Sequence, residues 1–281
     1  MKLIRYGEPG YEKPGLELDG GKRVDVSDYV VDYTPEFFAS GGLERLKQID
    51  TSSCPAVSGD ARLGSPVARP HKFVAIGLNY KLHAEEAKMP VPDEPVVFTK
   101  HTSCICGPDD GIVIPRGSTK LDYEVELAVV MKDKVRYLDS ESEAMAHVAG
   151  FTICNDVSER QFQIERGGNW VKGKSCDSFG PLGPTLVTAD ALPEYQNLEL
   201  SLKVNGETRQ KSNTNDMIFS VPHIIWYLSQ FMTLEPGDVI ITGTPFGVAM
   251  GMNPPQWLQA GDKVEVAIQH LGTQHQVVRE N

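Results

Sequence analysis

One ten-residue run, Leu121–Val130, combines three acidic residues with the apolar side chains of a buried strand. Glu124 and Glu126 stand two positions apart, and the four residues that follow them are all apolar. Because side chains i and i+2 of a strand point to the same face, the two carboxylates are expected to project together. Neighbouring carboxylates that lose hydration repel each other, and a divalent cation relieves both effects. The run predicts either a strand that borders a metal site or an exposed strand edge with solvated acids.

A second apolar segment also ends in an acidic residue. Phe151–Asn155 has the composition of a strand, and Asp156 follows it as a possible third oxygen ligand. Three carboxylates with the remaining positions filled by water suit Mg²⁺. A zinc site built on Cys104, Cys106 and His101 is disfavoured, because no second pair of ligands follows at the usual spacing. The predicted ligand set is therefore oxygen-only and binds magnesium.

A histidine and a glutamate lie upstream of the predicted ligands at a helical spacing. His83 and Glu86 are three residues apart and would share one face of a helical turn, whereas Glu85 would point elsewhere. A glutamate that orients an imidazole raises its basicity, so His83 could take a proton from water. Pairs of this kind are also common on protein surfaces, and that remains the alternative interpretation.

Three further polar residues follow Asp156. Arg160, Gln163 and Lys174 could hold a substrate carboxylate and stabilise developing negative charge, or they could belong to a solvated loop. Gly168–Ser175 also fits the phosphate-loop pattern G-x-x-x-x-G-K-S, which requires a strand before it and a helix after it. The polar segment 160–167 and the glycines and prolines of 176–184 supply neither, so nucleotide binding is not expected.

Strands dominate the rest of the sequence, which predicts a mainly β protein with some helix, of the α+β class. Residues 1–70 are expected to form a small N-terminal α/β unit, with 52–70 as a linker, and residues 71–281 the main domain. Helices are predicted from Thr34 to about Ile49 and over His83–Ala87, Ser140–His147 and Pro222–Phe231. Strands are predicted at Lys2–Tyr6, Leu16–Leu18, Arg23–Val26, Phe73–Ile76, Val96–Thr99, Gly111–Ile114, Glu124–Met131, Gly150–Asn155, Leu198–Val204, Glu207–Arg209, Val239–Thr242, Lys263–Ile268 and Thr273–Val278.

The overall charge narrows the class of partner. A formal net charge of −11 argues against nucleic acid or an anionic membrane as the main partner, although one site can still bind a small anion. Five cysteines without disulfide-like spacing, and a start that lacks an apolar signal segment, lead us to expect a cytoplasmic protein with reduced thiols.

Four ordered motifs resemble the fumarylacetoacetate hydrolase family, over roughly residues 70 to 280. They are Tyr123–Val130, Asn155–Gln163, Gly173–Asp177 and Leu234–Val248. The resemblance implies a mixed β-sandwich roll, a homodimer or larger assembly, and Mg²⁺ or Mn²⁺ held by Glu124, Glu126 and Asp156. It further implies His83 and Glu86 as the pair that activates water. Larger eukaryotic members carry a fourth acidic ligand where this chain has Ile76, so the chain resembles the three-carboxylate branch.

The same resemblance implies an activity. Lys174, Arg160, Gln163 and Thr244 fall where the family contacts substrate, and the N-terminal motifs Arg5–Gly7 and Lys13–Leu16 resemble bacterial members that act on sugar acids. Those members include 2,4-diketo-3-deoxy-L-rhamnonate hydrolases and proteins called ureidoglycolate lyases. The expected reaction is therefore hydrolysis of a carbon–carbon bond in a small anionic 2,4-dioxo acid, with release of pyruvate. Decarboxylation or lyase chemistry at the same site is the alternative, and a non-catalytic metal-binding protein is a more distant one.

Overall fold

A twelve-stranded mixed sheet forms the backbone of the molecule, which the computed structural model describes over residues 1–281. Its strands run in the order β4-β3-β2-β1-β14-β12-β11-β17-β6-β7, with β5 paired to β1 and β8 paired to β14. The central strands β11 (Val125–Met131) and β12 (Val148–Asn155) are buried at every residue, because apolar side chains point to both faces. This burial places the ends of β11 and β12, where the acidic residues stand, inside the protein.

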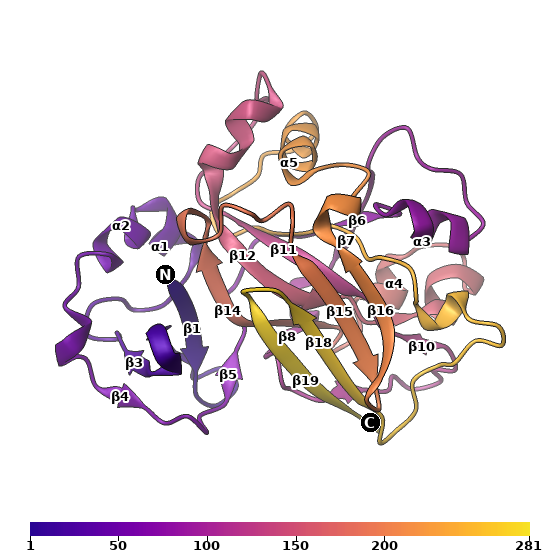
Figure 1. Ribbon diagram of the computed structural model, residues 1–281, viewed down its shortest axis with the longest axis horizontal. Coiled ribbons are helices and arrows are strands. Elements are labelled where there is room, and N and C mark those ends of the chain that lie inside the picture. The colour runs from indigo at the N-terminus through magenta and orange to yellow at the C-terminus, as the bar shows by residue number, and fades with distance from the viewer.

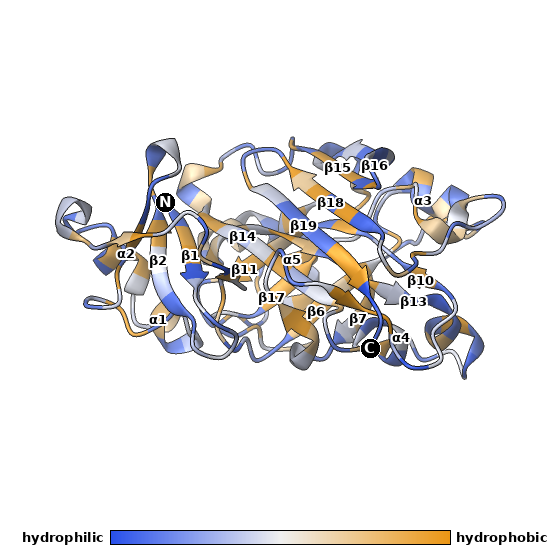
Figure 2. Ribbon diagram, turned by 90° about the horizontal axis from the view of Figure 1, so that it is seen from below, coloured by the Kyte–Doolittle hydropathy of each residue, from blue (hydrophilic) through white to orange (hydrophobic).

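A second, five-stranded sheet packs near the first, in the order β16-β15-β18-β19-β9. Its strands alternate between buried and exposed residues, as in β18 (Lys263–Ile268), so one face covers the core and the other meets solvent. In Figure 1 these strands lie in front of β11 and β12. Figure 2 shows apolar stretches along the strands in the middle of the molecule and hydrophilic residues in many of the loops. The mainly β, α+β fold class is confirmed.

The N-terminal unit shares the large sheet with the rest of the chain. Strand β1 (Lys2–Tyr6) pairs with β14 (Gly180–Thr188), and it also pairs with β5 (Leu63–Gly64). The predicted linker 52–70 therefore contains two short strands instead of a structureless connection, and this part of the prediction was wrong. Arg62 helps to fix this segment, because its guanidinium binds Glu12 of the N-terminal unit at 3.1 Å and Asp110 of the main domain at 2.6 Å.

The predicted helix at 34–49 is two helices. Thr34 caps α1 (Pro35–Ala39) as expected, because its hydroxyl accepts a hydrogen bond from the Phe37 amide. Gly41 then adopts a φ of +73°, which ends α1, and α2 (Gly42–Leu46) begins directly afterwards.

No strand was predicted over β14, because its glycines and prolines are typical of turns. Two of those prolines lie within the strand, since β14 is held in part by β1 and β12 beside it.

Most of the remaining elements agree with the predicted ranges to within a few residues, whereas the short elements at Val171–Lys174, Ile105–Cys106, Leu121–Asp122 and Ser158–Glu159 were not predicted. The helices are α3 (Lys81–Glu86), α4 (Val171–Lys174) and α5 (Val221–Ser229), and none is long and apolar enough to cross a membrane. Ser140–His147, predicted as a helix, is a 3₁₀ helix over Glu141–His147. The remaining strands are β2 (Lys13–Glu17), β3 (Arg23–Asp25), β4 (Ala56–Val57), β6 (Phe73–Gly77), β7 (Val96–Lys100), β8 (Ile105–Cys106), β9 (Ile112–Val113), β10 (Leu121–Asp122), β13 (Ser158–Glu159), β15 (Glu199–Val204), β16 (Glu207–Asn213), β17 (Val239–Ile241) and β19 (Gly272–Arg279).

Candidate active site

Three buried carboxylates meet where β11 begins and β12 ends. Glu124, Glu126 and Asp156 each place a carboxylate oxygen within 4.8 Å of the others. The antiparallel register pairs Val125 with Asn155, and the Asp156 amide donates to the Glu124 carbonyl at 2.8 Å. This pairing explains why residues 30 positions apart in sequence converge, and it fulfils the geometric expectation from the sequence.

Lys174 bridges two of the three acids. Its ammonium donates to Glu124 Oε2 and to Asp156 Oδ2, both at 2.7 Å, and its side chain is buried. The residue ends the short helix α4, where Gly173 packs so tightly that an added Cβ would lie 2.5 Å from the Gln163 backbone nitrogen. The missing side chain at Gly173 thus allows α4 to approach and bring Lys174 to the carboxylates.

Arg160 forms a second cationic contact with the cluster. Its guanidinium donates to Glu124 Oε1 at 2.5 Å, to Asp122 Oδ2 at 2.8 Å and to Gln163 Oε1 at 3.0 Å. Asp122 in turn accepts hydrogen bonds from the amides of Ala249 and Met250 at 2.7 and 3.1 Å. Asp122 was absent from the predicted site, although it directly precedes the Tyr123–Val130 motif.

Lys100 is a further cation that the sequence analysis missed. This fully buried lysine ends β7, and its ammonium donates to Asp156 Oδ1 at 2.5 Å. The Asp156 carboxylate is therefore held on one oxygen by Lys100 and on the other by Lys174. A lysine at the end of an apolar strand resembles an ordinary exposed strand end, so nothing in the sequence distinguished it.

The two glutamates at the start of β11, Glu124 just before it and Glu126 within it, have opposite electrostatic environments. Burial raises the pKa of Glu124, but the charges of Lys174, Arg160 and His83 outweigh it and hold that pKa at about 2. For Glu126, burial and then the charges of Asp156 and Glu124 raise the pKa well above its usual value. No ion pair includes Glu126, and its one hydrogen bond comes from the Gly243 amide at 2.7 Å. Glu126 is consequently the carboxylate whose ionised form a further positive charge would stabilise most.

These observations fit a divalent cation that prefers oxygen ligands. The donor set holds only carboxylates, all of them buried. Glu126 is the one carboxylate of the three that no cationic side chain pairs with. The hydroxyl of Tyr80 is buried without a hydrogen-bond partner, and after burial itself the charge of Glu126 is what most raises its pKa. Carboxylates with positions left for water are the usual surroundings of Mg²⁺ and Mn²⁺.

We expect Glu126→Gln to stabilise the metal-free protein at neutral and higher pH. An unfolded glutamate ionises near pH 4.5, whereas folded Glu126 keeps its proton to higher pH. The folded state then binds more protons than the unfolded state, so stability falls as pH rises from about 4.5 through the folded pKa. Melting temperatures between pH 5 and 8 in EDTA should fall more steeply for the parent than for the variant. With saturating Mg²⁺ the order should reverse, and a variant that melts lower without metal would contradict this assignment.

His83 and Glu86 lie on α3, beside the cluster. His83 Nδ1 is 3.2 Å from Glu86 Oε2, and the charge of His83 contributes to the low pKa of Glu124. Glu86 also accepts hydrogen bonds from the Gly247 amide at 3.0 and 3.2 Å. The pair borders a cavity of about 220 Å³, which is also lined by Ala87, Lys88, Val248, Met250 and Gly251. The structure thus brings the two residues together and places them at the edge of a partly open pocket.

Thr244 lies under the strand that carries the glutamates. Its hydroxyl donates to the Val125 carbonyl at 3.0 Å and accepts from Gln210 Nε2 at 2.9 Å. Both contacts hold the backbone of β11 in place, and the second acceptor position of the oxygen remains for another donor. A contact between Thr244 and substrate stays a prediction, as it does for Arg160 and Gln163.

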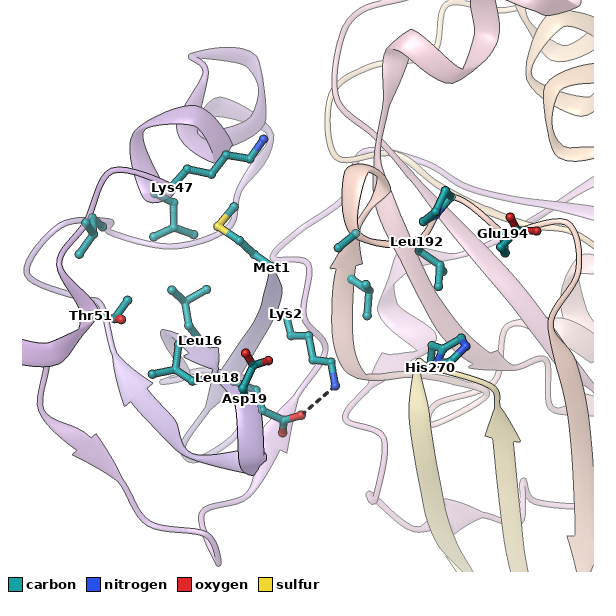
Figure 3. Close-up of a pocket in the computed structure, with 16 residues that line it drawn as sticks. Met1, Lys2, Leu16, Leu18, Asp19, Lys47, Thr51, Leu192, Glu194 and His270 are labelled. Atoms are coloured by element: carbon teal, nitrogen blue, oxygen red, sulfur yellow. Dashed lines mark ion pairs between the residues drawn. The ribbon is translucent and has the colours of Figure 1, made fainter.

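A larger cavity, of about 890 Å³, lies far from this chemistry. Figure 3 shows it between the N-terminal unit, with Met1, Lys2 and Leu16, and the main domain, with Leu192 and His270. Its polar side chains include the ion pair between Lys2 and Glu17, at 3.7 Å, and no predicted site residue lines it. Size alone therefore does not identify the active site, whereas the buried charges do.

Known proteins are similar to this chain over most or all of its length. The family model described as fumarylacetoacetate (FAA) hydrolase C-terminal matches residues 72–279. A protein of Burkholderia multivorans that is named as a hydrolase is 53% identical over 280 residues, or 99% of each chain. Both matches cover the segments that carry the carboxylates, the lysines and the His83–Glu86 pair.

Solved structures share the fold at full length. Fumarylacetoacetate hydrolase from psychrophilic Exiguobacterium antarcticum is 37% identical with a TM-score of 0.90, and 100% of both chains is covered. A 5-carboxymethyl-2-hydroxymuconate delta-isomerase from Mycobacterium smegmatis is 30% identical with a TM-score of 0.77, over 100% of this chain and 99% of that one. Maleylpyruvate hydrolase from Sphingobium sp. SYK-6, solved with manganese(II) and pyruvate, is 26% identical with a TM-score of 0.83, and both chains are covered completely.

Proposed function

The chain belongs to the fumarylacetoacetate hydrolase family, and we propose that it is a metal-dependent hydrolase that cleaves a carbon–carbon bond in a 2,4-dioxo acid. One observation carries the proposal: a His–Glu pair stands beside a buried cluster of three carboxylates. The carboxylates supply a site for a cation, and the pair supplies a base. A protein that only bound metal would need no base at that position.

The charges around the cluster favour an anionic ligand once a cation is bound. Three acids face Lys100 and Lys174, while Arg160 is matched by Asp122. With Glu126 ionised, the group carries one excess negative charge, which a divalent cation converts into one excess positive charge. A small 2-oxo acid carries the complementary charge at its carboxylate. The relative solved with manganese(II) and pyruvate supports this class of ligand.

His83 is proposed as the base of the hydrolysis. Glu86 holds Nδ1 of the imidazole, which leaves the other ring nitrogen to accept a proton from water. The hydroxyl oxygen of that water bonds to C4 of the substrate, the C3–C4 bond breaks, and its electron pair moves to C3. A proton on C3 then completes pyruvate, and the rest of the substrate leaves as a carboxylic acid.

The developing enolate needs positive charge close to its oxygen. When bound, the metal would act as a Lewis acid that stabilises negative charge on that oxygen. Lys174 is buried at the cluster and adds a second positive charge, while Arg160 and Gln163 would orient the substrate carboxylate. Mg²⁺ is proposed as the physiological ion, with Mn²⁺ as a substitute, and a cytoplasmic homodimer as the working form.

The same site could serve decarboxylation or lyase chemistry, because oxaloacetate and ureidoglycolate also present a carboxylate beside an oxygen. The isomerase among the solved structures shows that the fold accommodates other reactions. These reactions differ in what they require of His83, since only hydrolysis consumes a water that must be deprotonated.

The tail beyond C4 would enter the cavity beside His83. Lys88 and Glu86 give that cavity polar groups, so we propose a hydroxylated, sugar-acid tail. We expect kcat/KM to be higher for 2,4-diketo-3-deoxy-L-rhamnonate than for acetylpyruvate, because a hydrogen bond between a substrate hydroxyl and a charged side chain contributes about 1.5–3 kcal/mol that acetylpyruvate cannot gain. The measurement compares both compounds, oxaloacetate and ureidoglycolate in saturating Mg²⁺, with detection of pyruvate. If acetylpyruvate is preferred, the tail assignment fails, and if only the last two react, the hydrolase proposal fails.

A further inference from the structure

The Glu86 carboxylate rests on a turn, Gly247–Gly251, which follows β17 and ends in a 3₁₀ helix over Ala249–Gly251. Oε1 and Oε2 accept hydrogen bonds from the Gly247 amide at 3.0 and 3.2 Å, while Oε2 also faces His83 Nδ1 at 3.2 Å. These contacts fix the carboxylate from two sides. The orientation of His83 consequently depends on a segment more than 160 positions away in sequence.

The other side of the turn is anchored to the carboxylate cluster. The amides of Ala249 and Met250 donate to Asp122 at 2.7 and 3.1 Å, and Asp122 binds Arg160, which binds Glu124. One part of the turn thus holds Glu86, which supports the base. The neighbouring part holds Asp122, which binds Arg160 at the carboxylate cluster. The turn sets the distance between the two.

Gly251 makes room for this arrangement. A Cβ added to Gly251 would lie 2.1 Å from Glu86 Cδ and 2.3 Å from Oε1, so the Glu86 side chain occupies that space. Gly251 does not adopt a left-handed backbone, so an alanine would meet no strain of its own. Gly247 differs, since its φ is +100° and an added Cβ would lie 2.0 Å from the backbone oxygen of Arg209. Of these two glycines, a substitution of Gly251 would therefore act on Glu86, whereas a substitution of Gly247 would disturb the backbone.

We propose that Gly251 is a positioning residue of the reaction, because its missing side chain lets Glu86 hold His83 at the correct distance from the metal site. The proposal rests on the function proposed above. Displacing a supporting group by about 1 Å can lower turnover about 10²-fold. Because Gly251 also lines the cavity proposed for the substrate tail, the test uses acetylpyruvate, whose tail is a single methyl group. With this substrate, Gly251→Ala is expected to lower kcat by that order and to leave KM within about threefold, because the metal and carboxylate contacts are untouched.

A double-mutant cycle separates this role from a general loss of structure. Gly251→Ala and Glu86→Ala are compared alone and together, and the glycine change should have less than about a twofold effect once Glu86 is absent. Gly59→Ala is the matched control, because Gly59 is exposed and an added Cβ meets nothing within 4 Å. Melting temperature and Mn²⁺ affinity should match the parent in all variants. A Gly251→Ala effect that persists in full without Glu86 would overturn the proposal.

A readout without turnover keeps the test independent of the substrate. In ¹H–¹⁵N spectra of the imidazoles, His83 is assigned by its absence from His83→Ala. Gly251→Ala should shift the His83 resonances in the same direction as Glu86→Ala, and Gly59→Ala should not. Unchanged His83 resonances would overturn the positioning role even if no 2,4-dioxo acid were hydrolysed. Shifted resonances with unchanged turnover of an active parent would also overturn it, while absence of activity in the parent would count against the proposed function alone.

Discussion

Exhaustive dialysis against EDTA is expected to abolish turnover, and Mg²⁺ or Mn²⁺ should restore it. The three carboxylates converge within 4.8 Å, and Glu126 lies among them without a cationic partner. A Lewis acid contributes several kcal/mol to transition-state stabilisation, and each ~1.4 kcal/mol is tenfold in rate, so we expect a loss of at least about 10³-fold. The measurement is kcat before dialysis, after it, and after titration with each ion.

The fold should survive the loss of metal. Lys174, Lys100 and Arg160 each pair with a carboxylate of the cluster, so only part of the repulsion remains. Circular dichroism should therefore show a folded protein in EDTA, which separates loss of chemistry from loss of structure. Full activity in a sample shown by elemental analysis to be metal-free would refute the metal assignment.

His83→Ala is expected to lower turnover of a 2,4-dioxo acid by about 10²–10⁴-fold, the usual contribution of a general base. His83 is buried beside the cluster, and its Nδ1 is held by Glu86, so the substitution removes a base that is already oriented. Steady-state kinetics in saturating Mg²⁺ measure the loss. Glu86→Ala should produce a smaller loss, since the imidazole is retained.

Binding measurements show whether the site is otherwise intact. Affinities for Mn²⁺ and for oxalate, an enolate mimic, should be nearly the same in His83→Ala and the parent, because His83 contributes no ligand. His71→Ala is the matched control, since His71 is exposed and lies outside the site. Turnover within a few-fold of the parent would mean that another group activates water. Decarboxylation of oxaloacetate should be much less sensitive to the substitution than hydrolysis.

Local patterns in the sequence predicted most of the β structure. Asn205-Gly206, between two of the predicted strands, is a strong hairpin signal, and it joins β15 to β16, because both residues adopt the positive φ that a two-residue turn requires. The alternation of β18 and the apolar run of β11 predicted their elements within a residue. In these segments the local preference and the tertiary environment agree, so short-range information was sufficient.

Other segments take their structure from their neighbours. The residues Gly180–Pro184 favour turns by themselves, yet they form the start of β14, which pairs with β8 and β12. The linker residues Leu63 and Gly64 became a strand in the same way, because β1 offers its edge to them. Pairing across the sheet supplies backbone hydrogen bonds that local propensity cannot foresee.

The sequence by itself determined the strand of Glu124 and Glu126, the shared face of their carboxylates and the spacing of His83 and Glu86, because strand and helix periods place side chains by counting. Only the tertiary structure decided how closely Asp156 approaches them and that Lys100 and Lys174 each bind one of its two oxygens. It also decided that Glu86 packs against Gly247 and Gly251. These contacts join segments far apart in the chain. Their geometry follows from strand register and from close packing at glycines, which depend on the whole fold.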